Sequence, residues 1–65
     1  MKLEIYLKSG KAPTVFVFEY ATDSMGNKFE GDIKDLYISE NLTYQFIGKN
    51  QVVVNGSEIS FIELS

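Results

Sequence analysis

Alternation between apolar and polar side chains is the dominant pattern of this chain, and it predicts β-strands. In residues 2–8 the apolar side chains occupy positions 3, 5 and 7, which is the spacing of a strand with one buried face. Turn-forming residues fill positions 9–13, and residues 14–20 resume the alternation with β-branched and aromatic side chains. The two segments therefore predict an antiparallel hairpin.

The segment 14–20 is apolar on both of its faces. In a strand, Val15 and Val17 would point to one side, and Phe16, Phe18 and Tyr20 would point to the other. One small sheet cannot bury both faces. The pattern is therefore typical of a sandwich or barrel, or of a strand that leaves one face for another chain.

The middle of the chain has weaker patterns. Residues 21–32 are rich in turn formers and predict the longest loop, with a short hairpin tip at Gly26 and Asn27. In residues 32–41 the apolar positions fit either a strand or a helix that begins at Asp32. We favour the strand because the segment contains β-branched residues and ends in a predicted turn.

The last third of the chain predicts two further turns between strands. Alternating residues 42–47 are followed by turn formers at positions 48–50. Asn55 and Gly56 then separate two apolar runs, which indicates a type I′ hairpin with Val54 opposite Ser57. In that register four apolar residues share one buried face: Val52, Val54, Ile59 and Phe61.

The alternation changes phase near residue 61. Ile62 and Leu64 fall on the face opposite to Ile59 and Phe61. A β-bulge, a change of sheet or a second buried face would each explain this change.

These segments predict one all-β domain over residues 1–65, a five- to six-stranded antiparallel meander that closes toward a small barrel or sandwich. A domain of 65 residues buries a small share of its surface, so some additional stabilising device is expected. The chain has no Cys and no His, which removes disulfides and the usual ligands of structural metals. We therefore expect self-association into a homo-oligomer.

The chain is not expected to be an enzyme. Without His or Cys it lacks the common pairs of nucleophile and base, as well as the usual zinc ligands. Ser9 with Lys11, and Ser24 with Lys28, have the residue types of a Ser–Lys pair, but such pairs arise freely in turns. The acidic residues of segment 21–32 do not follow the spacing of a calcium loop. No cofactor and no metal is implied.

Charge and composition restrict the partners. The net charge is −3 and Arg is absent, whereas nucleic-acid binding normally uses a basic surface rich in Arg, so we expect no nucleic acid. The first residues alternate and form no continuous apolar run, so neither a signal peptide nor a membrane span is predicted. The absence of Cys favours a reducing compartment, and we expect a cytoplasmic protein.

Contact with a protein partner is the function that these exclusions leave. Aromatic side chains are enriched at the energetic centres of interfaces, and several lie outside the predicted core face, although a second core layer would use them equally well. Together with residues of segment 21–32 they form the predicted partner-binding set: Tyr6, Phe16, Phe18, Tyr20, Asp23, Met25, Lys28 and Tyr37.

The opening and closing segments resemble a known type of protein. Residues 2–11 (KLEIYLKSGK) and 57–64 (SEISFIEL) are similar to short β-rich proteins of Gram-positive bacteria and their phages. The resemblance implies a phage accessory protein that binds a host protein, such as a defence protein, and inhibits or modulates it.

The leading hypothesis is therefore a non-enzymatic protein-binding module that self-associates. One alternative is an oligomer that sequesters a small ligand such as a nucleotide, whose phosphates would be recognised by Lys side chains and backbone amides. The other alternative is a small-barrel nucleic-acid binder, which the strand count permits and the net charge disfavours.

Overall fold

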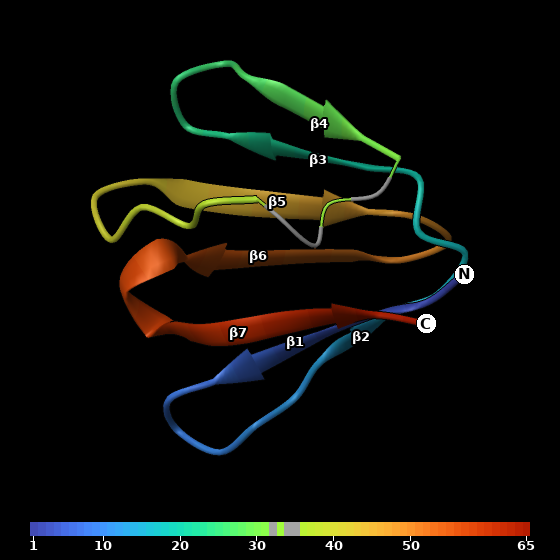
Figure 1. The fold of residues 1–65 in the computed structure, drawn as a ribbon, viewed down its shortest axis with the longest axis horizontal. Helices are drawn as coiled ribbons and strands as arrows, with labels where there is room; N and C mark the ends of the chain where they lie inside the picture. Colours follow the sequence, from blue (N-terminus) through green and yellow to red (C-terminus); the bar gives the residue numbers. More distant parts are fainter. Residues whose placement is uncertain (32, 34–35) are drawn as a thin grey trace.

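The computed structural model describes residues 1–31, 33 and 36–65, and these residues form an all-β fold of two antiparallel sheets (Figure 1). One sheet has the order β2-β1-β7 and the other has the order β4-β3-β5-β6. The all-β prediction is confirmed, but the described strands do not close into a barrel, and β1 pairs with β7 where a meander would pair only sequential strands. The strands are β1 (Leu3–Leu7), β2 (Thr14–Val15), β3 (Tyr20–Asp23), β4 (Lys28–Glu30), β5 (Thr43–Ile47), β6 (Gln51–Asn55) and β7 (Ile59–Leu64), with a 3-10 turn η1 (Gly56–Glu58) before β7.

The predicted hairpin of the first two strands is present, but its second strand is much shorter than predicted. β2 pairs with β1 through Leu3 opposite Val15, and it ends at Val15. The backbone of Phe16 bonds instead to the turn between β5 and β6, where its N–H donates to the Asn50 side chain at 2.8 Å and its carbonyl accepts from Lys49 at 2.7 Å. Val17 then adopts a φ of 49°, which redirects the chain into the other sheet. The continuous strand predicted over residues 14–20 is therefore wrong.

The segment predicted as the longest loop is mostly a hairpin. β3 and β4 pair with Ala21 opposite Phe29, and the tip lies between them at residues 24–27. The hairpin tip predicted at Gly26 and Asn27 is confirmed, whereas the loop predicted over the whole of residues 21–32 is wrong. Side chains of β3 and β4 have enough cross-strand partners to overcome the turn-rich composition.

The strand favoured for residues 32–41 is wrong wherever the structure describes this segment. Ile33 and residues 36–41 are neither strand nor helix, and positions 32, 34 and 35 lie outside the described residues. Ile33 is buried in the core, and the Leu36 N–H donates to the Ile33 carbonyl at 3.0 Å. The described part of this segment therefore contributes apolar side chains to the core without pairing with a strand.

The predicted hairpin at Asn55 and Gly56 is also wrong, because β6 and β7 belong to different sheets. Asn55 has a φ of −72° and not the positive φ of a type I′ turn, and η1 turns the chain from one sheet to the other. A Cβ atom on Gly56 would overlap the Ser39 carbonyl oxygen. The glycine is therefore required by the close approach of the segment before β5, which explains the residue better than a tight hairpin does.

The phase change near residue 61 is a β-bulge, one of the three explanations that the sequence left open. Tyr6 lies opposite Phe61 and Leu7 lies opposite Ile59, so Ser60 is the extra residue of β7. Beyond the bulge Ile62 and Leu64 turn toward the core and Phe61 turns outward. The bulge therefore decides which apolar side chains of β7 are exposed.

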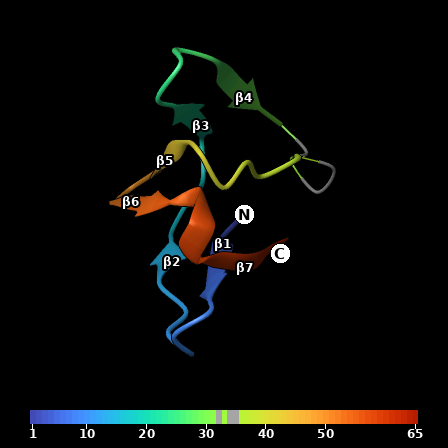
Figure 2. The same cartoon turned by 90° about the vertical axis from the view of Figure 1, so that its left-hand side faces the viewer.

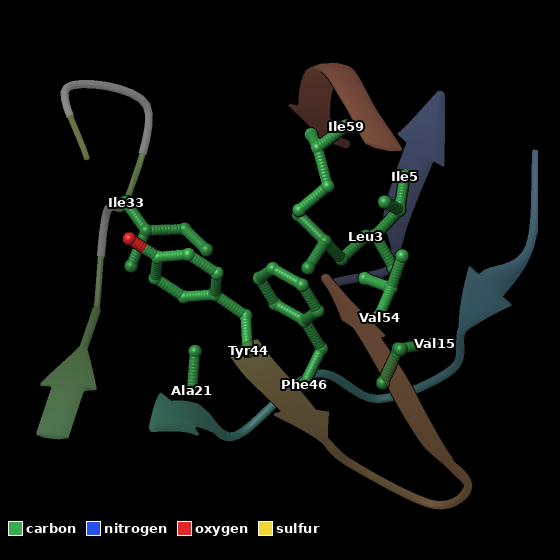
Figure 3. Close-up of a cluster of buried hydrophobic side chains, with 9 residues drawn as sticks. All are labelled: Leu3, Ile5, Val15, Ala21, Ile33, Tyr44, Phe46, Val54 and Ile59. Carbon is green, nitrogen blue, oxygen red and sulfur yellow. The ribbon is translucent and has the colours of Figure 1, made fainter. Parts of the chain in front are cut away.

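The core lies between the two sheets and receives side chains from both (Figure 3). Leu3 and Ile5 were predicted inward and are fully buried, whereas Phe61 was predicted inward and is 53% exposed. Tyr44 and Phe46 of β5 are the largest fully buried side chains, with ring centroids 6.2 Å apart. The buried cluster consists of Leu3, Ile5, Val15, Ala21, Ile33, Tyr44, Phe46, Val54 and Ile59.

Candidate docking surface

A stacked pair of aromatic rings, one half-buried and one exposed, crosses the outer face of the β2-β1-β7 sheet. Tyr6 of β1 and Phe61 of β7 are cross-strand neighbours, with ring centroids 4.3 Å apart and planes inclined by 14°. The bulge places Phe61 on this face, because strict alternation from buried Ile59 would point it inward. The sheet therefore presents the Phe61 ring, stacked on Tyr6, to solvent.

Two carboxylates flank these rings, and the ion pairs of the described residues include neither of them. Glu4 lies directly opposite Glu63, and the Tyr6 hydroxyl donates to Glu4 Oε2 at 3.1 Å. That hydrogen bond, followed by partial burial and the negative charges of Glu4 and Glu63, raises the pKa of Tyr6 above 10.0. Like charges in this position repel each other. The ion pairs found among the described residues are Lys8 with Glu40 and Lys28 with Glu30, so neither of these two carboxylates has a cationic partner there. We call Glu4, Tyr6, Phe61 and Glu63 the acidic–aromatic face.

A groove runs beside this face, between β7 and the segment before β5. It has a volume of about 350 Å³, and Tyr37 and Phe61 lie on its two sides. Tyr37 is 85% exposed, and Leu36 and Ile38 of the same segment contribute apolar side chains, while Lys8 and Glu40, 4.0 Å apart as an ion pair, also line the groove. Figure 2 shows β7 at the edge of its sheet and the segment that forms the wall above it. The groove therefore continues the acidic–aromatic face around the edge of the sheet.

Buried contacts hold the wall of the groove in place. The Ser39 N–H donates to the hydroxyl of buried Tyr44 at 2.8 Å, and the Gly56 N–H donates to the Leu42 carbonyl at 2.7 Å. Since Gly56 also packs directly against the Ser39 carbonyl, the wall is fixed from the core side and from η1. The groove is therefore part of the folded domain.

The outer edge of β7 has unpaired backbone groups. Lys2 and Ser65 exchange two backbone hydrogen bonds of 2.8 and 2.9 Å, and in an antiparallel ladder such pairs alternate along the strands. The residues of β7 that bond to β1 are thus Phe61 and Glu63, and the N–H and C=O groups of Ile62 and Leu64 point away from β1. No hydrogen bond described in the structure reaches the outward groups of these two residues.

The predicted aromatic residues do not form one surface. Tyr6 belongs to the acidic–aromatic face, and Tyr37 lies across the groove from Phe61. Phe16 is exposed at the crossing between the sheets, and Phe18 is half-buried against the core. Because β2 ends at Val15, these residues are not aligned along one strand as predicted.

The other predicted partner-binding residues gather around the β3–β4 hairpin. The Asp23 carboxylate accepts the N–H groups of Met25 at 2.9 Å and Asn27 at 3.0 Å, and the hydrogen bonds from Asn27 are the main cause that lowers its pKa below 3.8. Asp23 thus stabilises the turn. The Lys28 ammonium nitrogen lies 4.6 Å from the centroid of the Tyr20 ring and 3.4 Å from a Glu30 carboxylate oxygen. Lys28 therefore already contacts an aromatic ring and an anion within its own hairpin.

A second hollow of about 310 Å³ lies beside β4 of this hairpin and is lined by Lys28, Phe29, Glu30, Ile33 and Leu36, and Met25 is exposed at the hairpin tip. The partner-binding roles of Phe16, Phe18, Tyr20, Asp23, Met25 and Lys28 stay predictions. The sequence reasoning missed Glu4, Phe61 and Glu63, although the phase change near residue 61 pointed to the end of β7.

Other site types find little support in the part of the chain that the structure describes. Its acidic residues include no cluster of three or more that could hold a metal ion, and it contains no helix long and apolar enough to cross a bilayer. Comparison with known protein families, curated proteins and solved structures gave no significant match. The resemblance to short proteins of Gram-positive bacteria and their phages therefore stays a prediction.

Proposed function

We propose that this chain is a non-enzymatic protein-binding module that docks a partner protein on the acidic–aromatic face and the adjoining groove. One observation carries the proposal: half-buried Tyr6 and exposed Phe61 stack beside a groove of mixed polar and apolar lining and an unpaired strand edge. Rigid aromatic side chains next to a pocket are typical centres of binding energy.

The Ser60 bulge supports this function. The bulge disrupts the hydrogen-bond ladder between β1 and β7 locally. It also orients the Phe61 side chain outward and the Ile62 side chain toward the core. Cross-strand aromatic pairs contribute roughly 0.2–1 kcal/mol to a sheet, and the 53% exposed Phe61 ring leaves further apolar surface for a partner to cover.

The resemblance found in the sequence suggests which kind of protein the partner is. The resemblance of residues 2–11 and 57–64 to short phage proteins supports a host protein as the partner, and inhibition or modulation as the outcome. Self-association remains compatible with this role, since a second copy would enlarge the docking surface.

Affinity capture from a host lysate tests the proposal when matched variants are compared. Phe61→Ser removes half of the aromatic stack, and Phe16→Ser is a matched control because Phe16 is 54% exposed, against 53% for Phe61, and lies away from the groove. We expect Phe61→Ser to lose a protein that the parent chain and Phe16→Ser both capture, with all three chains folded by circular dichroism. Equal capture by Phe61→Ser and the parent chain would refute this surface, and loss in Phe16→Ser alone would move the interface to the crossing between the sheets.

A further inference from the structure

We infer that the outer edge of β7 binds an extended segment of the partner as an added antiparallel strand, and that this segment alternates basic and apolar side chains. Since the added strand would occupy the acidic–aromatic face and the groove, this inference rests on the docking function proposed above. It specifies the chemistry of the partner.

The backbone of β7 provides the first part of the recognition. Ile62 and Leu64 direct their N–H and C=O groups away from β1, and this spacing of two residues is the repeat with which an antiparallel strand pairs. β7 has six residues, whereas the other edge strands β2, β4 and β6 have two, three and five. Proteins usually protect a long edge with Lys, Pro or a covering segment, and the interior of β7 has neither Lys nor Pro.

The two faces of β7 select different side chains in the added strand. On the outer face, a side chain next to Glu63 and Phe61 meets the carboxylates of Glu4 and Glu63, which form no ion pair among the described residues, and the face of an aromatic ring. Both features attract an ammonium or guanidinium group. On the other face, a side chain beside Ile62 meets the groove and the apolar side chains of Leu36 and Ile38. Successive residues of the added strand alternate between these faces, which gives the basic and apolar alternation.

A second copy of this chain fits the edge less well. If Ile62 lay opposite the same residue of a second copy, Phe61 would face Glu63. A shift by two residues would place Glu63 opposite Glu63 in one direction, and in the other it would pair Ile62 with the bulged Ser60. Each copy also carries a net charge of −3. Charge complementarity therefore favours a basic segment from a different protein.

Short synthetic peptides provide the direct test. The probe is a peptide of alternating Lys and Val, and the controls are a peptide of alternating Glu and Val and a peptide with the Lys and Val residues in two blocks. We expect the alternating Lys peptide to bind at least about tenfold more tightly than either control. Hydrogen exchange of the Ile62 and Leu64 amides should slow on binding, because these N–H groups become paired. Equal binding of the blocked Lys peptide, or unchanged exchange at both amides, would overturn the strand addition.

Two altered chains complete the test. Glu63→Lys lies on the exposed outer face, so the domain should fold and should exchange its preference from the Lys peptide to the Glu peptide. A synthetic chain with an N-methyl group on the Ile62 nitrogen removes one outward donor and keeps the side chain, and it should lose the Lys peptide. An unchanged preference in Glu63→Lys would overturn the charge recognition. Sedimentation experiments test whether a second copy occupies the edge. If the parent chain forms a dimer and the N-methylated chain is a monomer, a second copy binds this edge, and the inference of a basic partner segment is overturned.

These results separate the inference from the proposed function. If no peptide binds but Phe61→Ser still loses its captured protein, docking on the face stands and strand addition fails. If the Lys peptide binds and Phe61→Ser captures the same proteins as the parent chain, the edge recognises basic strands and the aromatic docking surface is refuted.

Discussion

Replacing Tyr44 with Phe isolates the contact that joins the core to the groove. Tyr44 is buried, and its hydroxyl oxygen accepts the Ser39 N–H at 2.8 Å. The substitution keeps the ring that packs 6.2 Å from Phe46 and removes the hydroxyl alone. One such hydrogen bond contributes about 1 kcal/mol, and for a domain of this size that corresponds to a fall in Tm of roughly 4–8 °C.

Thermal unfolding followed by circular dichroism measures this effect, and two other variants define its scale. Tyr44→Ala also creates a cavity and should cost about 3–5 kcal/mol. Tyr37→Phe removes an exposed hydroxyl for which the structure describes no hydrogen bond, so the stability should change by less than about 0.5 kcal/mol. Hydrogen exchange should in addition show a faster Ser39 amide in Tyr44→Phe, because its acceptor is lost.

Two results would refute the reasoning. If Tyr44→Phe melts at the same temperature as Tyr37→Phe and the Ser39 amide exchanges at its original rate, the hydroxyl does not hold the groove wall. If Tyr44→Phe is as unstable as Tyr44→Ala, the hydroxyl contributes more to the free energy of unfolding than one hydrogen bond to a half-buried amide can.

Three further substitutions test other parts of the structure. Gly56→Ala should destabilise the domain by about 2 kcal/mol in urea denaturation, because the new Cβ meets backbone atoms that cannot move freely. Val17→Asn should raise the stability by about 1 kcal/mol in the same assay, since Asn tolerates the positive φ better than a β-branched residue and the valine is exposed. Asp23 has a lowered pKa in the folded state, so its ionised form stabilises the fold above pH 3.8 and this contribution is lost as the pH falls through the lower folded value. Melting temperatures of Asp23→Asn should therefore fall less steeply below that pH than those of the parent chain.

The parts of the fold that were predictable depend on local alternation. Leu3 and Ile5, and likewise Tyr44 and Phe46, recur at every second position, and the structure buries these four side chains in β1 and β5. The crossing at Val17 was not predictable, because its side chain favours a strand and the competing hydrogen bonds come from the distant turn between β5 and β6. Tertiary contacts there override local propensity.

The same limit applies to the turn before β7 and to the candidate site. Asn55 and Gly56 are the residues preferred in a tight hairpin. In the structure, however, position 56 requires glycine because a side chain there would overlap the Ser39 backbone, and no local sequence pattern indicates this contact. The phase change near Phe61 was visible in the sequence and proved to be a bulge. The charge repulsion between Glu4 and Glu63 was not visible, since it depends on pairing between the first and last strands.

That pairing also has a consequence for the order in which the fold can assemble. Because Lys2 and Ser65 are bonded to each other, a few added residues could join the ends of the chain, and new ends could be opened in the turn at residues 9–11. In such a circular permutant β7 and β1 would follow each other as a hairpin, whereas in the present order their pairing must close a loop of nearly the whole chain. The permutant should reach the same sheets faster, because the five residue pairs of β1 with β7 become local and only the two residue pairs of β1 with β2 become distant in their place.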